Sequence, residues 1–193
     1  MKHRSSQILF AHWNETRGRR AMPDRGEIDP GSMRGGLPDA FIVATDPLTE
    51  HPFRLAGTRV CALFNRELKG SSFLQLWDSE QREQIAGLVA VVTEEAVGVV
   101  AGASGISAEG VSLDLELLLL PLQHGGRTDA RLIGTLSPLS APYWLGAHPL
   151  GPLALKEHRY LGPRMNTPAP VLTLPPGTRR IRHGLAVYDG GHA

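Results

Sequence analysis

The sequence of 193 residues contains a single cysteine, Cys61, so no disulfide can form within the chain. This excludes the small secreted scaffolds that depend on disulfides, and it favours a reducing compartment. Long apolar runs are also missing. The run from Leu117 to Leu122 contains a proline and is far too short to cross a membrane, and residues 8–11 are too few for a signal peptide. We therefore expect a cytoplasmic protein without membrane association.

An excess of charge of one sign is absent as well. Twenty Lys and Arg residues stand against nineteen Asp and Glu, which leaves a net charge of +1 and no field of the kind that attracts nucleic acid. The ends are basic and the middle is acidic, because residues 1–35 carry +3, residues 36–153 carry −6 and residues 154–193 carry +4. A basic motif at residues 178–183 has few cationic groups and no interleaved aromatic side chains, so nucleic acid is a disfavoured partner.

The residue patterns of common catalytic and metal sites do not occur. The eight histidines form no H-x-x-H or H-E-x-x-H pair, and one thiol cannot complete a zinc site. No G-x-S-x-G motif marks a nucleophile, so a Ser-His-Asp triad would have to assemble by chance from scattered residues. These absences predict a non-enzymatic protein with no metal site.

The N-terminal region, residues 1–36, combines a helix with a connector rich in Gly, Pro and Arg. Ser5 or Ser6 is a suitable N-cap, Gly18 is a natural stop, and apolar residues recur between them at helical spacing. Ile8, Leu9 and Trp13 share one face of this amphipathic helix and form our candidate interface. That face can pack on the chain's own sheet or on a partner, and the sequence favours neither arrangement over the other.

The middle of the chain alternates strand and helix patterns. Two strands, from Ala40 and over residues 51–57, read as a hairpin, and short helical segments follow over residues 58–77. A long helix over residues 78–95 precedes three strands at residues 96–103, 111–120 and 128–136. In the second of these, apolar and polar residues alternate from Val111 to Leu117, so one face should be buried and the other solvated. The order predicts an α+β antiparallel sheet.

Three segments carry a family resemblance: PDRGEIDP at residues 23–30, FRLAGT at 53–58 and ELKGSSF at 67–73. With this element order, the chain resembles a PAS domain, and more specifically the single-domain PAS proteins of alphaproteobacteria. RHGLAVYDGG at residues 182–191 resembles the end of such proteins. The resemblance implies a five-stranded antiparallel sheet with short helices and one long helix over one face, spanning residues 37–140, beside the N-terminal amphipathic helix. It also implies sensing or signalling through protein contacts, often as a homodimer.

Residues 141–193 form the third predicted region, a proline-rich basic C-terminal extension. Nine of the fifteen prolines lie between Pro138 and Pro176, and proline prevents long regular elements. We therefore expect an extended tail there.

A PAS domain holds its ligands in a cavity between the sheet and the helices, so the apolar residues of the covering helices are the candidate lining. These are Phe64, Phe73, Trp77, Ile85 and Leu88. No cofactor is identified. The long helix lacks a histidine to ligate haem, and Cys61 lies outside the Asn-Cys-Arg-Phe motif of photoactive flavin domains.

Arg54 is a charge inside a strand, between two apolar residues. It either faces water or pairs with a carboxylate such as Asp29 or with an anionic ligand, and Arg25 lies near Asp29 in the sequence. We keep Arg54, Arg25 and Asp29 as a candidate anion or ion-pair site. The leading hypothesis is a non-enzymatic PAS-type sensory or signalling module that binds a small molecule, a signalling protein partner or both. The alternative is a ligand-free protein-interaction scaffold.

Overall fold

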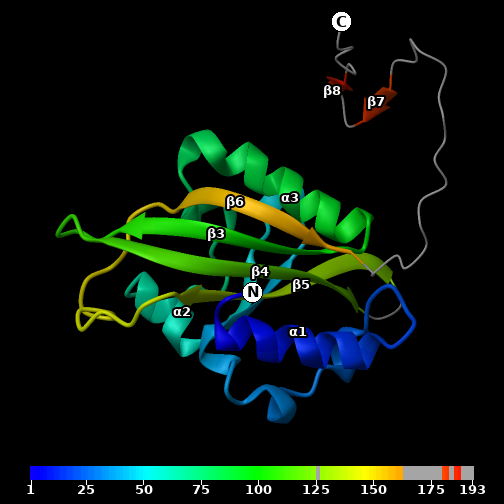
Figure 1. Cartoon of the computed structure of the whole chain (residues 1–193), viewed down its shortest axis with the longest axis horizontal. Helices are drawn as coiled ribbons and strands as arrows, with labels where there is room; N and C mark the ends of the chain where they lie inside the picture. The colour runs from blue at the N-terminus through cyan, green and yellow to red at the C-terminus, as the bar shows by residue number, and fades with distance from the viewer. Residues whose placement is uncertain (125–126, 163–179, 183–184, 188–193) are drawn as a thin grey trace, which may run out of the picture. The chain divides into compact units, whose positions relative to one another are not determined.

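The computed structural model describes residues 1–124, 127–162, 180–182 and 185–187 (Figure 1). Residues 1–163 form one compact unit and residues 164–193 a second. In the second unit, β7 (Arg180–Arg182) pairs antiparallel with β8 (Leu185–Val187). Of the basic motif at residues 178–183, only residues 180–182 are therefore described. No helix in the described ranges is long and apolar enough to span a membrane.

The first unit is built on one antiparallel sheet in the order β2-β1-β5-β4-β3-β6. Its strands are β1 (Ala40–Ala44), β2 (Phe53–Ala56), β3 (Gly98–Ile106), β4 (Ser112–His124), β5 (Arg127–Pro138) and β6 (Ala154–Leu161). The early hairpin β1–β2 joins the later strands through β1 and β5, which pair antiparallel. The predicted antiparallel sheet made from two groups of strands is thus confirmed.

The predicted strand count of five is wrong, because β6 adds a sixth strand beside β3. This strand lies within residues 141–193, which we assigned to a C-terminal extension. Its middle residues are exposed at the edge of the sheet, so β6 has none of the apolar alternation that reveals a strand in sequence.

One face of the sheet carries the main core and is covered by α2 (Thr58–Leu63), α3 (Arg82–Glu94) and short 3-10 turns at Leu74–Leu76 and Ser79–Gln81. We call it the inner face. The predicted long helix is α3, and its apolar stripe Ile85, Leu88, Val89 and Val92 is buried. The helix points this stripe at β3, β4 and β5, which explains why the stripe recurs every three or four residues.

The outer face of the sheet is covered by α1 (Arg4–Arg17), on the side opposite α3 (Figure 1). Leu9 and Trp13 of α1 pack with Leu118, Leu120 and Ile133 of the sheet in a second apolar cluster. The expectation of a solvated second face is therefore wrong for the central strands, which are buried on both sides. Helix α1 ends at Gly18 as predicted, where φ is positive at 56°, but its N-cap is His3 and not Ser5 or Ser6.

Residues 18–39, here called the connector, run from α1 to β1 in a series of 3-10 turns. These turns are η1 (Arg25–Glu27), η2 (Pro30–Met33) and η3 (Leu37–Asp39). Asp24 and Glu27 form a capping box on η1, and Asp29 caps η2 through the N–H groups of Gly31 and Ser32. Local caps of this kind give a segment without a helix or strand a defined path over the outer face.

Candidate functional site

The five residues predicted to line an internal cavity lie between sheet and helices, but their side chains fill that space. They are buried to at least 92%, from Phe64 at 8% exposed to Trp77 and Ile85 at 0%. Phe73 packs against Trp77 with ring centroids 6.0 Å apart, and against Phe41 at 5.7 Å. The pockets described below are lined by other residues, so the candidate binding sites lie elsewhere.

Helix α1 is fixed to the chain's own sheet by buried polar contacts. The Trp13 indole donates a hydrogen bond to the Pro121 carbonyl oxygen at 2.8 Å, and the Ser6 and Thr135 hydroxyls are 2.9 Å apart. Of the candidate interface, Leu9 and Trp13 are 1% and 3% exposed, while Ile8 is half-buried. The helix thus packs within the chain, and the area that a partner would need is already covered.

The start of α1 is also held by a buried acid, Asp39. Asp39, which is fully buried, accepts hydrogen bonds from the Ser5 hydroxyl and from the Arg59 guanidinium, which approaches to 2.9 Å. This carboxylate connects α1, the end of the connector and α2. Its other oxygen, Oδ1, has no partner among the described residues.

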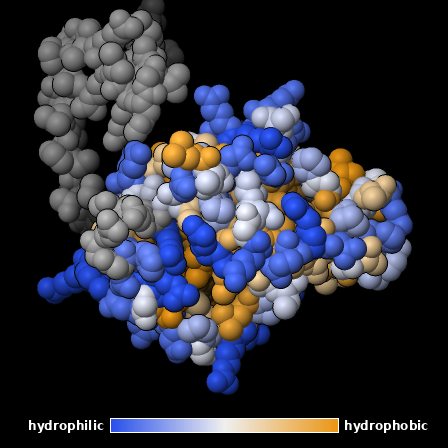
Figure 2. Space-filling model, turned by 180° about the vertical axis from the view of Figure 1, so that it is seen from behind, coloured by the Kyte–Doolittle hydropathy of each residue, from blue (hydrophilic) through white to orange (hydrophobic). Residues whose placement is uncertain are grey.

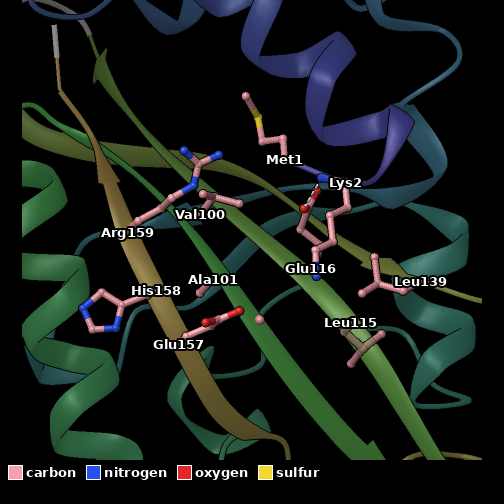
Figure 3. A pocket seen from close by; sticks show the side chains of 11 residues that line it. Met1, Lys2, Val100, Ala101, Leu115, Glu116, Leu139, Glu157, His158 and Arg159 are labelled. Carbon is pink, nitrogen blue, oxygen red and sulfur yellow. Dashed lines mark hydrogen bonds between the residues drawn. The ribbon is translucent and has the colours of Figure 1, made fainter. Parts of the chain in front are cut away.

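A small pocket of about 290 Å³ opens where α1 begins, over strands β3, β4 and β6 (Figure 3). Glu116 is 5% exposed, and its two carboxylate oxygens accept the main-chain N–H groups of Lys2 and His3. A carboxylate at this place also interacts favourably with the N-terminal end of the helix. Because Glu116 already has these partners, we interpret the pocket as a docking contact for α1 and not as a ligand site.

A larger pocket of about 510 Å³ lies between the connector and the outer face of β1, β2 and β5; we call it the connector pocket. Most of its wall is apolar. The apolar lining consists of Ile28, Pro30, Met33, Leu37, Pro38, Ala40, Phe41, Ile42, Leu55, Ala56 and Ile133. The volume falls within the range of about 300–1,000 Å³ that is typical of small-molecule sites.

Arg25 and Arg34 are the charged residues that line the connector pocket. Arg131 on β5 lies near Arg25 and Arg54: burial lowers the pKa of Arg131, and the positive charges of these two arginines lower it further. The candidate site Arg54, Arg25 and Asp29 is therefore only partly assembled. Arg25 and Arg54 both lie near Arg131. The Asp29 carboxylate, however, accepts hydrogen bonds from the Ser32 hydroxyl and from the N–H groups of η2. Neither arginine forms an ion pair with it among the described residues.

Arg34 and Arg131 were missed as site residues. Arg34 follows a Gly/Pro-rich turn and Arg131 lies in a strand about a hundred residues away, so no motif connects them. Only the pairing of β5 with β1 brings Arg131 to the end of the site that contains Arg25. The one sequence signal was Arg54, a charge at an unexpected place in a strand.

A third pocket, of about 890 Å³, lies between α3 and the loop joining β1 to β2. Its α3 wall contains Ala86, Gly87 and Ala90, whose small side chains offer a ligand little contact area. Because of this limited contact area, the pocket is a weaker ligand site than the connector pocket, in spite of its size. Figure 2 shows the molecule from behind, where hydrophilic side chains surround patches of hydrophobic ones.

His51 in this third pocket is the clearest strained residue. Its backbone φ is 59°, the preceding Glu50 has φ 54°, and the imidazole is 5% exposed. The Nδ1 atom has no hydrogen-bond partner within the described ranges. Burial lowers the pKa of His51 below its ordinary value of 6.5, against the opposing influence of Asp46 and Glu50. At any given pH the folded protein therefore favours the neutral form of this side chain more than the unfolded chain does.

We predict that acid destabilises the protein through His51. Below about pH 6.5 the unfolded chain binds a proton that the folded chain does not, so the free energy of unfolding should fall as the pH decreases. The fall should stop once the pH passes below the pKa of His51 in the folded state. Urea unfolding at pH 7.5 and pH 5.5 measures this, with His51→Asn as the control, since asparagine tolerates the left-handed backbone. An equal pH dependence in both proteins would exclude His51 as the cause.

Comparison with known proteins agrees with this geometry. The family model described as a PAS domain matches residues 1–137, which include α1, the connector and the strands β1 to β5 up to Ser137. No curated protein matches the chain. The match covers more than half of the 193 residues, and the antiparallel sheet with α2 and α3 on one face is consistent with it. The chain therefore belongs to the PAS domain family.

Proposed function

We propose that this protein is a non-enzymatic sensory module that binds a small molecule in the connector pocket and transmits the result to a protein partner through the docking of α1. PAS domains are generally sensory and signalling modules, which gives the class of function. The location of the ligand and the route of the signal are inferred from the contacts of the connector.

A single observation carries the proposal: the connector pocket is shared between the connector and the sheet. Ile28 and Met33 of the connector line it together with Ile42 and Ile133 of the strands. A molecule in the pocket would contact both sides, so its affinity would depend on how the connector lies on the sheet. A ligand with such a difference in affinity shifts the balance between the two arrangements.

The connector leads directly to α1, which provides the route of the signal. The main-chain N–H of Asp29 donates to Nε2 of His12 on α1 at 3.1 Å, and Asp39 at the other end accepts from Ser5 of α1. Movement of the connector would therefore change the contacts of α1 at both ends. If α1 leaves the sheet, the apolar outer face is exposed to a signalling partner or to a second copy of the chain.

The alternative function is a ligand-free scaffold that acts only through its surfaces. The packed inner face favours it, because the usual place for a PAS ligand is filled by Phe73, Trp77 and their neighbours. The two functions differ in whether the connector pocket is occupied. The resemblance to single-domain alphaproteobacterial proteins, the cytoplasmic location and the homodimer remain predictions.

Occupancy of the pocket can be tested with the full chain. The purified protein is denatured, released small molecules are identified by mass spectrometry, and a thermal-shift screen covers weakly bound compounds. Leu55 lines the pocket and is 45% exposed, so Leu55→Trp should fill the pocket without disturbing the core. The matched control is Leu48→Trp, at a residue that is 95% exposed and outside the pocket. We expect the released molecule or the thermal shift in the wild type and the control, and its loss in Leu55→Trp.

The same experiment can overturn the proposal. If the wild type releases no molecule and no compound shifts its melting temperature, the scaffold function is correct. If a compound binds equally well to Leu55→Trp, the protein senses it at another site, and the role of the connector is wrong.

A further inference from the structure

We infer that the connector pocket selects an organic anion with an apolar body, that is, a carboxylate or a similar acid attached to an alkyl or aryl group. This inference rests on the proposed function and names the chemical class of its ligand. Three features of the pocket support it: its apolar walls, its two lining arginines and the absence, among the described residues, of acids free to neutralise these arginines.

The apolar walls of the pocket favour a ligand with an apolar body. Met33, Ile42 and Ile133 are at most 9% exposed and form the deep part of the pocket, whereas Leu55 is 45% exposed at the edge strand. Filling the pocket would remove this apolar surface from water, which is favourable in proportion to the area covered. A small inorganic anion would leave these walls uncovered, so the walls themselves select against it.

The two arginines that line the pocket favour a ligand with an anionic head group. Arg25 and Arg34 line the pocket and are exposed, and none of the described residues that line it is acidic. Neither guanidinium forms an ion pair with a carboxylate in the part of the chain that the structure describes. A guanidinium binds a carboxylate with two parallel hydrogen bonds, so each of these arginines can hold the head group of such a ligand.

Nearby acids that could neutralise the arginines are already engaged. Glu27 pairs with Arg20 at 2.9 Å, and Asp29 is held by Ser32 and the N–H groups of η2. Arg131 lies close enough to Arg25 and to Arg54 for their positive charges to interact, which strengthens the positive potential at this end of the pocket. The site therefore combines an apolar wall with guanidinium groups that have no carboxylate partner among the described residues, and this arrangement complements an amphiphilic anion.

The experiment compares ligands that share one alkyl chain and differ in charge. Dodecanoate and dodecyltrimethylammonium are titrated into the full chain by calorimetry, at concentrations where neither forms micelles. We expect one dodecanoate per chain and no binding of the cation. Naphthalene-1-acetate is the second anion: binding of both anions indicates the shared chemistry, and binding of dodecanoate alone indicates a lipid-derived acid.

Two variants connect the charge selectivity to the pocket. Arg25→Gln combined with Arg34→Gln should weaken dodecanoate binding by about tenfold or more, since both charge-assisted contacts are lost. Arg66→Gln removes an exposed arginine outside the pocket and should leave the affinity unchanged. Circular dichroism and the melting temperature of the double variant show whether it is folded; both arginines are exposed, so we expect no change.

The outcomes separate this inference from the proposed function. If anion and cation bind equally, or the double variant binds dodecanoate as well as the wild type, the anionic class is wrong. The connector pocket then still stands as a site if Leu55→Trp abolishes binding. A third outcome is that neither charged ligand binds, while the thermal-shift screen finds a neutral compound whose binding is lost in Leu55→Trp. In that case only the anionic class of the ligand is wrong. If nothing binds in either experiment, the proposed function fails with it.

Discussion

Replacing Trp13 with alanine is expected to lower the free energy of unfolding by about 3–5 kcal/mol, the usual cost of removing a buried tryptophan side chain. Trp13 is 3% exposed, packs with Leu118 and Leu120 of the sheet, and donates a hydrogen bond to the Pro121 carbonyl oxygen. The variant would leave a cavity at the centre of the contact between α1 and the sheet and remove that hydrogen bond. Urea unfolding measures the loss.

The same variant tests whether α1 can be released. Hydrogen exchange should show reduced protection over residues 4–17, while the strands of the inner core stay protected. Glu15→Ala is the control, because Glu15 is an exposed residue of the same helix. A loss below about 1 kcal/mol with unchanged exchange would contradict the packing of α1 on its own sheet.

Light scattering on Trp13→Ala distinguishes packing within the chain from packing on a partner. Release of α1 exposes apolar side chains such as Ile42, Leu118 and Ile133, so the average mass should rise with protein concentration. If α1 instead packed on a partner chain, the same variant would lower the mass. The sequence left these two arrangements open, and the expected results have opposite signs.

The strand β4 shows why the sequence predicted only half of the sheet's burial. Residues 111–117 alternate between apolar and polar, and this part was interpreted as a strand with one solvated face. The alternation ends at Leu117, and the continuous apolar run to Leu122 is typical of a strand that is covered on both faces. Leu117 and Leu119 belong to the inner core, whereas Leu118 and Leu120 pack with α1. The continuous apolar run from Leu117 to Leu122 therefore indicated that the second face is buried, whereas the alternation before Leu117 did not.

The sixth strand had no comparable signal. In β6, Lys156 to Tyr160 are all exposed, and the strand lies in a proline-rich region. Its place is fixed by main-chain pairing with β3, and main-chain hydrogen bonds do not depend on side-chain type. Hydrophobic periodicity cannot predict an edge strand whose side chains are almost all in water.

The candidate site was predictable only in its separate parts. Arg54 stood out as a charged residue inside a strand, and Arg25 was included only because it lies near Asp29 in the sequence. The pocket itself depends on the connector crossing β1, β2 and β5, which come together from distant parts of the chain. For the inner face, the burial of Phe73 and Trp77 could be predicted, but whether they enclose a cavity or fill it depends on side-chain packing that a sequence pattern does not contain.

Gly134→Ala should be the most damaging small substitution in the sheet, with an expected loss of about 3 kcal/mol or more in the free energy of unfolding. Gly134 lies on β5, opposite Phe41 of β1, and the Phe41 ring lies across it. A Cβ at this position would be 2.3 Å from the main-chain oxygen of Leu118 and 2.5 Å from the ring. The ring cannot move away, because it packs against Phe53 at 5.6 Å and Phe73 at 5.7 Å.

Gly102→Ala is the matched control for this prediction, since Gly102 is also a glycine within a strand of the same sheet. The nearest atom to its added Cβ is Cβ of Lys156 at 3.6 Å, an ordinary contact, so the change should stay within about 0.5 kcal/mol. Urea unfolding of the two variants compares a glycine that the packing requires with one that it does not. If both variants lose a similar amount of stability, the loss reflects the general cost of substituting a glycine in a strand. The Phe41 ring and the β4 main chain would then not be the reason why residue 134 is a glycine.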